Sequence, residues 1–343
     1  MTIYNKKGDS LELTIRPARS DEAPQLIILL KKQYGTCYYD AMYDEEAVRH
    51  ALETASLRVV VAELAEGGII GIIGANSVNP FPGSLVFTML VIDIRFRGFG
   101  LGKRLSRFLM DLIPPDAYTC IYGHIITLDA LSQTTHYRFG YRMAGLLLNC
   151  YIYDREAEYM AGLPLPFKDS LMVACLPQRK MDAGTLYAAS PHGVYIEAVY
   201  QELRVGYTLT IPGEVNPTAF RTGYTFHQDE NHYYGELFVQ EAGFDFSVIL
   251  DRLLGQYAAS GQTINAFVNL NDPACPYGVS VLEKQGFFFT GVQPLSGDYE
   301  YLILHYSRDL EVPFEQIAVI PEFLERFNYI QAQYKEARHV RKD

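Results

Sequence analysis

The chain has 343 residues, 40 acidic side chains against 29 basic ones, a formal net charge of −11 and 49% apolar residues. A single hydrophobic core seldom grows beyond about 250–300 residues, so this length predicts two domains. The negative charge opposes attraction to a phosphate backbone, which argues against nucleic acid as a partner, and the apolar content excludes a disordered chain.

Five cysteines are present, and none belongs to a CxxC pair that could begin a zinc site. We therefore expect free thiols and no metal. The N-terminal residues lack the apolar stretch of a signal peptide, and no apolar run reaches 18 residues. These features predict a soluble cytoplasmic protein with no membrane segment.

Hydrophobic periodicity in the first half predicts the element order βααβββαβαββ. Residues 11–17 alternate as a strand does, and residues 21–34 follow with helical spacing after Ser20, a candidate N-cap. Short turns between the next strands predict an antiparallel meander. The expected strands are 11–17, 57–64, 69–77, 85–94, 120–127, 142–152 and 170–176, and the expected helices are 21–34, 44–53, 103–112 and 132–139.

The second half contains a weaker copy of this pattern. HYRFGYRMAG at 136–145 and LEKQGFFFTG at 282–291 share a glycine, a following aromatic residue and a second glycine five residues later. Expected strands 233–240, 263–270 and 301–306 and an expected helix 246–257 match in order. We predict a duplicated module, with domains at residues 1–180 and 185–343.

A glycine-rich turn, RGFGLG at 97–102, separates the strand 85–94 from the next helix. Glycines let the backbone approach a ligand closely, and the unpaired N–H groups at a helix start favour an anion such as a pyrophosphate. Arg97, Lys103 and Arg104 add positive charge. The turn matches neither a Walker A loop nor a complete dinucleotide-binding fingerprint.

The strand residues at 90–92 followed by this turn resemble the (R/Q)xxGx(G/A) acetyl-CoA motif of the GNAT superfamily of N-acyltransferases. The resemblance covers residues 11 to about 178 and includes HYRFGY at 136–141, which is similar to the LYEKLGF segment of the family. It implies an α/β (α+β) GNAT fold, a mixed central sheet flanked by helices, with acetyl-CoA as cosubstrate. The cofactor-binding residues it implies are Leu90, Val91, Ile92, Arg97, Gly98, Phe99, Gly100, Leu101, Gly102, Lys103 and Ser132.

The same resemblance implies that an amine attacks the thioester directly while a protein group protonates the thiolate. The family's tyrosine falls on His136, with Tyr137 one place later, so both are candidate catalytic residues. Asp93 and Glu63 are the nearest acidic candidates for a general base. Asp129, Ser132 and Gln133 either contact the cofactor or cap a helix at Ser132.

The expected function is acetyl-CoA-dependent N-acyl transfer to an amine of a small molecule or a protein. The alternative is a non-catalytic acyl-CoA sensor or interaction protein. The second half lacks an RxxGxG turn, and its Glu241–Phe246 segment carries two acidic residues, so we expect a degenerate GNAT-like domain. Shaping the amine site, self-association into a homo-oligomer and support of the first domain remain alternative roles for it. Tyr38, Tyr39 and Tyr43 are candidates for lining a cleft.

Overall fold

The computed structural model describes residues 1–36, 38–77, 80–114, 116–152, 168–213, 215–230, 232–257, 262–307 and 311–340. Its contacts divide the chain into two compact units. The first unit contains the described residues up to Ile121 together with Ile152, and the second contains Tyr122–Tyr151 and those from Lys168 onward. Residues 122–151 and 168–180, which the sequence assigns to the first domain, therefore lie in the second unit. The domain boundary at residues 180–185, inferred from the repeated sequence pattern, stays a prediction.

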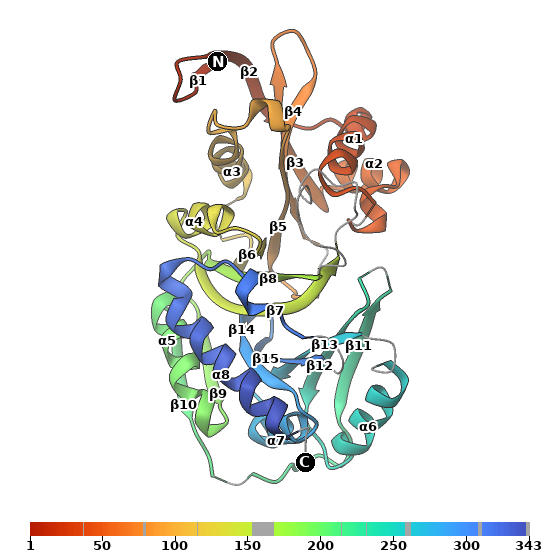
Figure 1. Ribbon diagram of the computed structural model, residues 1–343, viewed down its shortest axis with the longest axis vertical. Coiled ribbons are helices and arrows are strands. Elements are labelled where there is room, and N and C mark those ends of the chain that lie inside the picture. Colours follow the sequence, from red (N-terminus) through yellow and green to blue (C-terminus); the bar gives the residue numbers. More distant parts are fainter. Residues whose placement is uncertain are drawn as a thin grey trace. The chain divides into compact units, whose positions relative to one another are not determined.

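The first unit is an antiparallel sheet covered by helices (Figure 1). The strands pair in chain order, which confirms the predicted meander. Helix α3 lies on one face of the sheet, and α1 and α2 lie on the other. The elements are β1 (Thr2–Tyr4), β2 (Ser10–Pro17), α1 (Ala23–Tyr34), α2 (Glu45–Glu53), β3 (Leu57–Leu64), β4 (Ile69–Asn76), β5 (Leu85–Ile92) and α3 (Leu101–Leu112), with short 3-10 turns η1 (Ser20–Glu22), η2 (Asp40–Met42) and η3 (Ile94–Phe96).

Helix α3 shows how the sequence sets this packing. Leu101, Leu105 and Leu109 recur every fourth residue, and each is at most 2% exposed. Their stripe contacts the sheet, while Lys103 and Arg107 on the other side face solvent. Burial of each leucine contributes about 1.5–3 kcal/mol, so the helix that follows the glycine turn is firmly anchored.

The second unit has a mixed sheet in the order β6-β8-β7-β14-β15-β13-β12-β11 and a separate parallel pair, β9 and β10. Helices α5 and α8 pack against β14, and α7 packs against β13. The elements are β6 (Cys120–Ile126), α4 (Leu131–Arg138), β7 (Arg142–Ile152), β8 (Lys168–Pro177), β9 (Asp182–Tyr187), η5 (Ser190–His192), α5 (Gly193–Leu203), β10 (Gly206–Thr210), β11 (Gly223–Asp229), β12 (Tyr234–Glu241), α6 (Phe246–Tyr257), β13 (Thr263–Asn269), α7 (Cys275–Lys284), β14 (Phe288–Ser296), β15 (Tyr299–Ser307), η7 (Phe314–Gln316), η8 (Pro321–Phe323) and α8 (Leu324–Val340).

The two glycine-containing segments singled out in the sequence meet within this unit. Gly145 of β7 pairs with Gly291 of β14, and a Cβ atom on Gly145 would lie 2.9 Å from the Gly291 Cα. The first glycines of the two segments, Gly140 and Gly286, both have positive φ, at 98° and 85°. The first glycines of the two segments thus share a left-handed backbone, whereas of the second glycines only Gly291 has a positive φ, of 146°. The close strand contact requires glycine on both sides.

Candidate functional site

Strand β5 carries a bulge just before the glycine turn. Ile72 pairs with Val91 and Gly74 pairs with Thr88, so Met89 and Leu90 together oppose a single residue of β4. Met89 has φ of 55°, a left-handed conformation that costs a residue other than glycine about 1–2 kcal/mol. A bulge leaves its extra residue outside the ladder of hydrogen bonds and redirects the strand. The backbone at Leu90 is therefore turned away from regular strand geometry where the sequence predicts pantetheine contacts.

The turn after β5 presents backbone N–H groups to open space. Gly98 and Gly100 have φ of 89° and 71°, and nothing lies within 4 Å of a Cβ built on either glycine. Gly100 is the N-cap of α3 and makes no side-chain capping bond. No described residue accepts a hydrogen bond from the N–H groups between Gly98 and Lys103. Free N–H groups, the positive end of a 12-residue helix and exposed glycines together form an anion-binding geometry.

The cationic side chains around this turn differ in how they are held. Arg97 is exposed, and its guanidinium donates to the Gln33 Oε1 at 2.9 Å and to the Ile92 carbonyl at 3.4 Å. Lys103 and Arg104 are exposed on the first turn of α3. Arg97 is thus anchored beside the turn, while the other two extend from the helix start.

The two carboxylates considered as general bases are engaged elsewhere. Asp93 is 6% exposed and pairs with Arg95 at 2.8 Å and Lys32 at 3.2 Å. The hydrogen bonds from Arg95 hold the pKa of Asp93 well below its usual range, against the opposing effect of burial. Glu63 accepts a hydrogen bond from Arg16 at 2.9 Å. Asp93 is a permanently ionised carboxylate that fixes η3, and a carboxylate of such low pKa is a poor proton acceptor.

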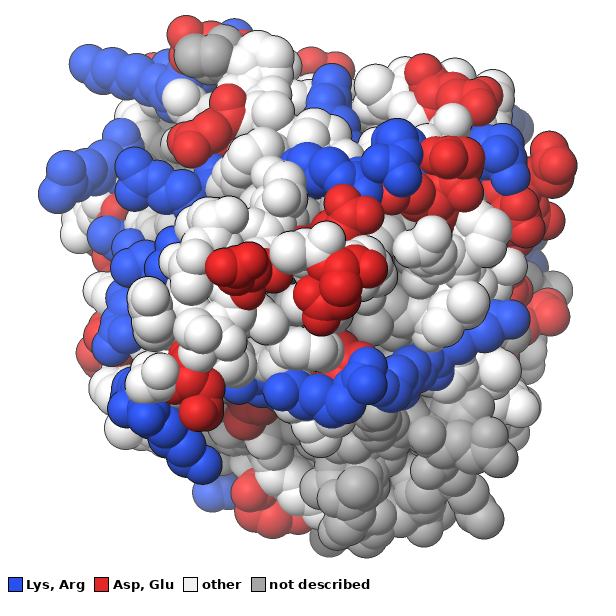
Figure 2. Space-filling view, turned by 90° about the horizontal axis from the view of Figure 1, so that it is seen from above, with Lys and Arg blue, Asp and Glu red and all other residues white. Residues whose placement is uncertain are grey.

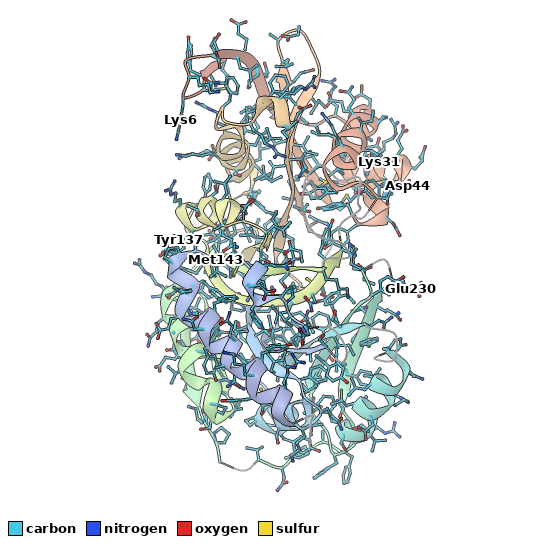
Figure 3. The ribbon with its side chains drawn as sticks, viewed as in Figure 1. Lys6, Lys31, Asp44, Tyr137, Met143 and Glu230 are labelled. Carbon is cyan, nitrogen blue, oxygen red and sulfur yellow. The ribbon has the colours of Figure 1, made fainter. Side chains whose placement is uncertain are left out.

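The two candidate catalytic residues, His136 and Tyr137, lie on α4 in the second unit. Figure 3 labels Tyr137 on this helix. The His136 Nδ1 is 2.8 Å from the Ser132 carbonyl, which can only accept, so this nitrogen carries the proton. The ring packs over Gly123 and edge-on to Tyr141, with ring centroids 5.0 Å apart. Burial lowers the pKa of His136, and the Ser132 hydrogen bond offsets part of that effect. At neutral pH this favours an uncharged imidazole, whose Nε2 accepts a proton rather than donates one.

Other side chains of α4 have mainly structural contacts. The Tyr137 ring lies under the Arg142 guanidinium, 4.9 Å from its centroid. The buried Gln133 amide donates to the Ala318 carbonyl and accepts from the Ile320 N–H. The helix starts at Leu131 with Ala130 as its N-cap, so Ser132 lies inside the helix and does not cap it. The Leu131 N–H donates to the Asp129 Oδ1 at 2.8 Å.

The predicted cleft tyrosines do not share one environment. Tyr38 is 7% exposed, and its hydroxyl is paired with Thr88 of the bulged strand. Tyr39 is 51% exposed, whereas the Tyr43 hydroxyl accepts a hydrogen bond from the Tyr38 N–H at 3.0 Å. Tyr38 is therefore a buried neighbour of the bulge rather than a surface that a substrate touches.

The corresponding turn of the second unit, Glu241–Asp245 after β12, is closed. Its N–H groups at Ala242, Gly243 and Phe244 donate to Asp272, Thr222 and the Ala219 carbonyl. A Cβ on Gly243 would lie 2.5 Å from the Arg221 backbone. Strands β12 and β13 stay paired in parallel from Tyr234 to Val239. The N–H groups of residues 242–244 are therefore taken up, and Gly243 packs directly against backbone, so this part of the turn offers an anion neither donors nor space.

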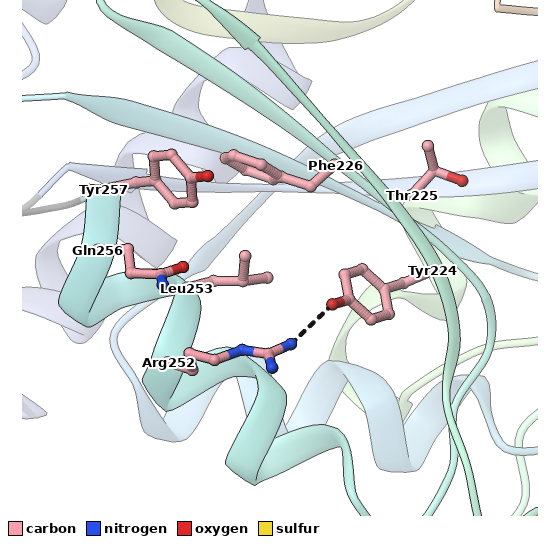
Figure 4. Close-up of a pocket in the computed structure, with 7 residues that line it drawn as sticks. All are labelled: Tyr224, Thr225, Phe226, Arg252, Leu253, Gln256 and Tyr257. Atoms are coloured by element: carbon pink, nitrogen blue, oxygen red, sulfur yellow. Dashed lines mark hydrogen bonds between the residues drawn. The ribbon is translucent and has the colours of Figure 1, made fainter.

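A shallow hollow of about 490 Å³ lies between β11 and α6 of the second unit (Figure 4). Its aromatic walls are Tyr224, Phe226 and Tyr257, and Arg252 donates to the Tyr224 hydroxyl at 2.9 Å. The hollow belongs to the second unit, whereas the glycine turn belongs to the first. Its only guanidinium is already bonded within the wall, and nothing in the lining selects a particular ligand.

Neither the surface charge nor the candidate metal-binding side chains of the described residues indicate a particular ligand. On the face seen in Figure 2, basic and acidic side chains are interspersed. Among the described residues, no group of three or more His, Cys, Asp or Glu side chains is placed to hold a metal ion. Cys120, Cys150, Cys175 and Cys275 are buried, and Cys37 lies outside the described residues. None of the helices that the structure describes is long and apolar enough to cross a membrane.

Comparison with known proteins finds similarity at the level of structure. No protein-family model matches the sequence, and no curated protein is significantly similar to it. Among solved structures, yncA of Salmonella typhimurium, described as an acetyltransferase and solved with acetyl-CoA, has 16% identity and a TM-score of 0.41. The match covers 50% of this chain and 97% of the yncA chain.

Two further structures give similar values. Spermidine N-acetyltransferase SpeG of Vibrio cholerae has 16% identity and a TM-score of 0.40, covering 49% of this chain and 94% of its own. Ribosomal-protein-alanine N-acetyltransferase of Brucella melitensis has 20% identity and a TM-score of 0.39, covering 48% and 99%. The chain is an α/β protein of which about half is similar to N-acetyltransferase structures.

Proposed function

We propose that this chain is an acetyl-CoA-dependent N-acyltransferase of the GNAT superfamily, which transfers an acetyl group to an amine of a small molecule or a protein. The observation that carries the proposal is the open turn between β5 and α3. Residues 98–103 offer N–H groups with no acceptor among the described residues, beside two left-handed glycines and directly after a bulged strand. The sequence of this turn, RGFGLG at 97–102, resembles the family motif. A pyrophosphate is the anion that this arrangement suits.

The proposed cofactor contacts follow the strand and the turn. The backbone of Leu90, Val91 and Ile92 would hold pantetheine, and the turn from Arg97 to Lys103 would hold the pyrophosphate. Ser132 on α4 is a proposed further contact. Acetyl-CoA, when bound, supplies the activated thioester; the chain supplies fixed donors that orient it and polarise its carbonyl oxygen.

The proposed reaction is direct attack. The amine nitrogen forms a bond to the thioester carbonyl carbon, the C–S bond breaks, and the sulfur leaves as a thiolate that takes up a proton. The His136 Nε2 takes up the proton that the amine loses, and the Tyr137 O–H is the proposed donor of the proton that the thiolate takes up. The low pKa of Asp93 removes it from the candidate bases.

We propose that the second module is a degenerate copy that binds no cofactor of its own. The matching glycines at 140, 145, 286 and 291 support the duplication. The closed turn at 241–245 supports the loss of cofactor binding. At the position that matches His136, four residues before the first glycine, the second copy has Leu282, which cannot transfer a proton.

The alternative, a non-catalytic acyl-CoA sensor, is favoured by one observation: Asp93 and Glu63 are both paired with basic side chains, so neither is free as a base. A turnover assay separates the two functions. Thiol release is measured with acetyl-CoA and a panel of alkyl diamines, aminoglycosides and lysine peptides. Sustained release that requires both the amine and acetyl-CoA supports the enzyme, whereas binding of acetyl-CoA without turnover on any amine supports the sensor.

A further inference from the structure

Tyr38 lies where the segment between α1 and α2 meets the bulge of β5. Its ring is buried and stacks on Tyr34, with centroids 4.9 Å apart and planes 20° apart. Its hydroxyl is paired with the Thr88 Oγ1. Thr88 is the last residue of β5 that pairs with β4 before the bulge, which begins at Met89.

Met89 needs such restraint, because its left-handed backbone is unfavourable for a residue with a side chain. The Met89 side chain fills the space above Gly74, where a Cβ would lie 2.5 Å from the methionine Cε. Next to Met89 in the chain, the Thr88 side chain is held by the Tyr38 hydroxyl. Removal of either contact should loosen the backbone at the bulge.

We infer that Tyr38 is a positioning residue: its hydroxyl, through Thr88, holds the β5 bulge and so fixes the direction of the Leu90 backbone. The inference rests on the proposed function, which assigns that backbone to the acyl-CoA. Tyr38 is buried behind the strand, so it acts on the substrate only through the bulge. Its effect should fall on the orientation of the thioester rather than on the pyrophosphate turn, which lies six or more residues further along the chain.

The first test is a double-mutant cycle of Tyr38→Phe and Thr88→Val, with turnover and acetyl-CoA affinity measured separately. Each single substitution should lower kcat about tenfold and leave the Kd for acetyl-CoA within about threefold, because a small misplacement of reacting groups costs rate more than binding. The double variant should be no slower than the slower single one, since both remove the same contact. Tyr118→Phe is the matched control: it also removes a hydrogen bond, from Arg58 at 3.0 Å, away from the bulge.

The second test does not depend on activity. Hydrogen exchange of the Met89 and Leu90 amides should be about fivefold faster in Tyr38→Phe than in wild type or Tyr118→Phe. Unchanged exchange and unchanged kcat in a folded Tyr38→Phe protein would overturn the inference, as would fully additive effects in the cycle. If no variant and no wild-type protein turns over an amine, the proposed function fails, while faster exchange at the bulge still supports the positioning role of Tyr38.

Discussion

Substitution of Gly100 by alanine tests the anion site at the point where the backbone is most constrained. Gly100 has φ of 71° and ψ of 21°, so an alanine there costs about 1–2 kcal/mol of folding stability. Its methyl group would enter the open space beside the free N–H groups. Loss of one charge-assisted hydrogen bond to a phosphate is worth about 1.5–3 kcal/mol, which corresponds to a Kd for acetyl-CoA raised roughly 10- to 150-fold.

Gly102→Ala is the matched control. Gly102 has no positive φ, and a Cβ there would meet the Leu90 methyl groups at 3.9 Å, an ordinary contact. Alanine is also the better helix former by about 1 kcal/mol, so this variant should be at least as stable as wild type and bind acetyl-CoA within about threefold. Calorimetric titration measures the Kd of both variants for acetyl-CoA, and circular dichroism confirms that both are folded. A folded Gly100→Ala protein that binds acetyl-CoA as tightly as wild type would refute the site.

Three further substitutions probe the neighbouring groups. Arg97→Glu places a negative charge beside the pyrophosphate and should weaken acetyl-CoA binding by at least about 1.5 kcal/mol; an unchanged Kd in calorimetry would argue against its role. His136→Gln should lower kcat by about 100-fold and flatten the acidic limb of the kcat–pH profile. In wild type this limb should lie below the ordinary histidine pKa, because burial lowers the pKa of His136. An unaltered profile would show that His136 takes no part in catalysis. Asp93→Asn should lower the free energy of unfolding, measured in urea, by about 1 kcal/mol at pH 7. This loss should shrink below about pH 4. The reason is that a carboxyl group whose pKa is lower in the folded state stabilises the fold above its unfolded pKa and loses that effect in acid. An equal cost at pH 7 and pH 3 would contradict the ion pairs assigned to Asp93.

Much of the fold could be predicted from hydrophobic periodicity. The strand 57–64 and the helix 246–257 are confirmed to the residue, and the α/β class is confirmed. Apolar residues in these segments recur with a single regular spacing, and turn residues follow each segment. The secondary structure that the local sequence favours is therefore the one that the tertiary packing requires. Helix α3 starts at Leu101, two residues earlier than predicted, because the left-handed Gly100 serves as its N-cap.

The bulge was not predicted, since it depends on contacts between distant residues. Met89 is an ordinary apolar residue in the sequence, and only the pairing of β4 with β5 shows that it has a left-handed backbone. A signal was present: Gly71 and Gly74 interrupt the apolar strand β4, and glycine inside a strand indicates close approach by a neighbour. The partner of Tyr38 likewise lies 50 residues away, beyond the reach of any local pattern.

Calorimetric titration of the wild-type protein with acetyl-CoA, with CoA and ADP as comparisons, tests the central claim most directly. The open turn at 98–103 and the closed turn at 241–245 together predict micromolar binding with one molecule of acetyl-CoA per chain. Absence of binding up to about millimolar concentration would contradict the cofactor site. Binding of two molecules per chain would contradict the closed second module.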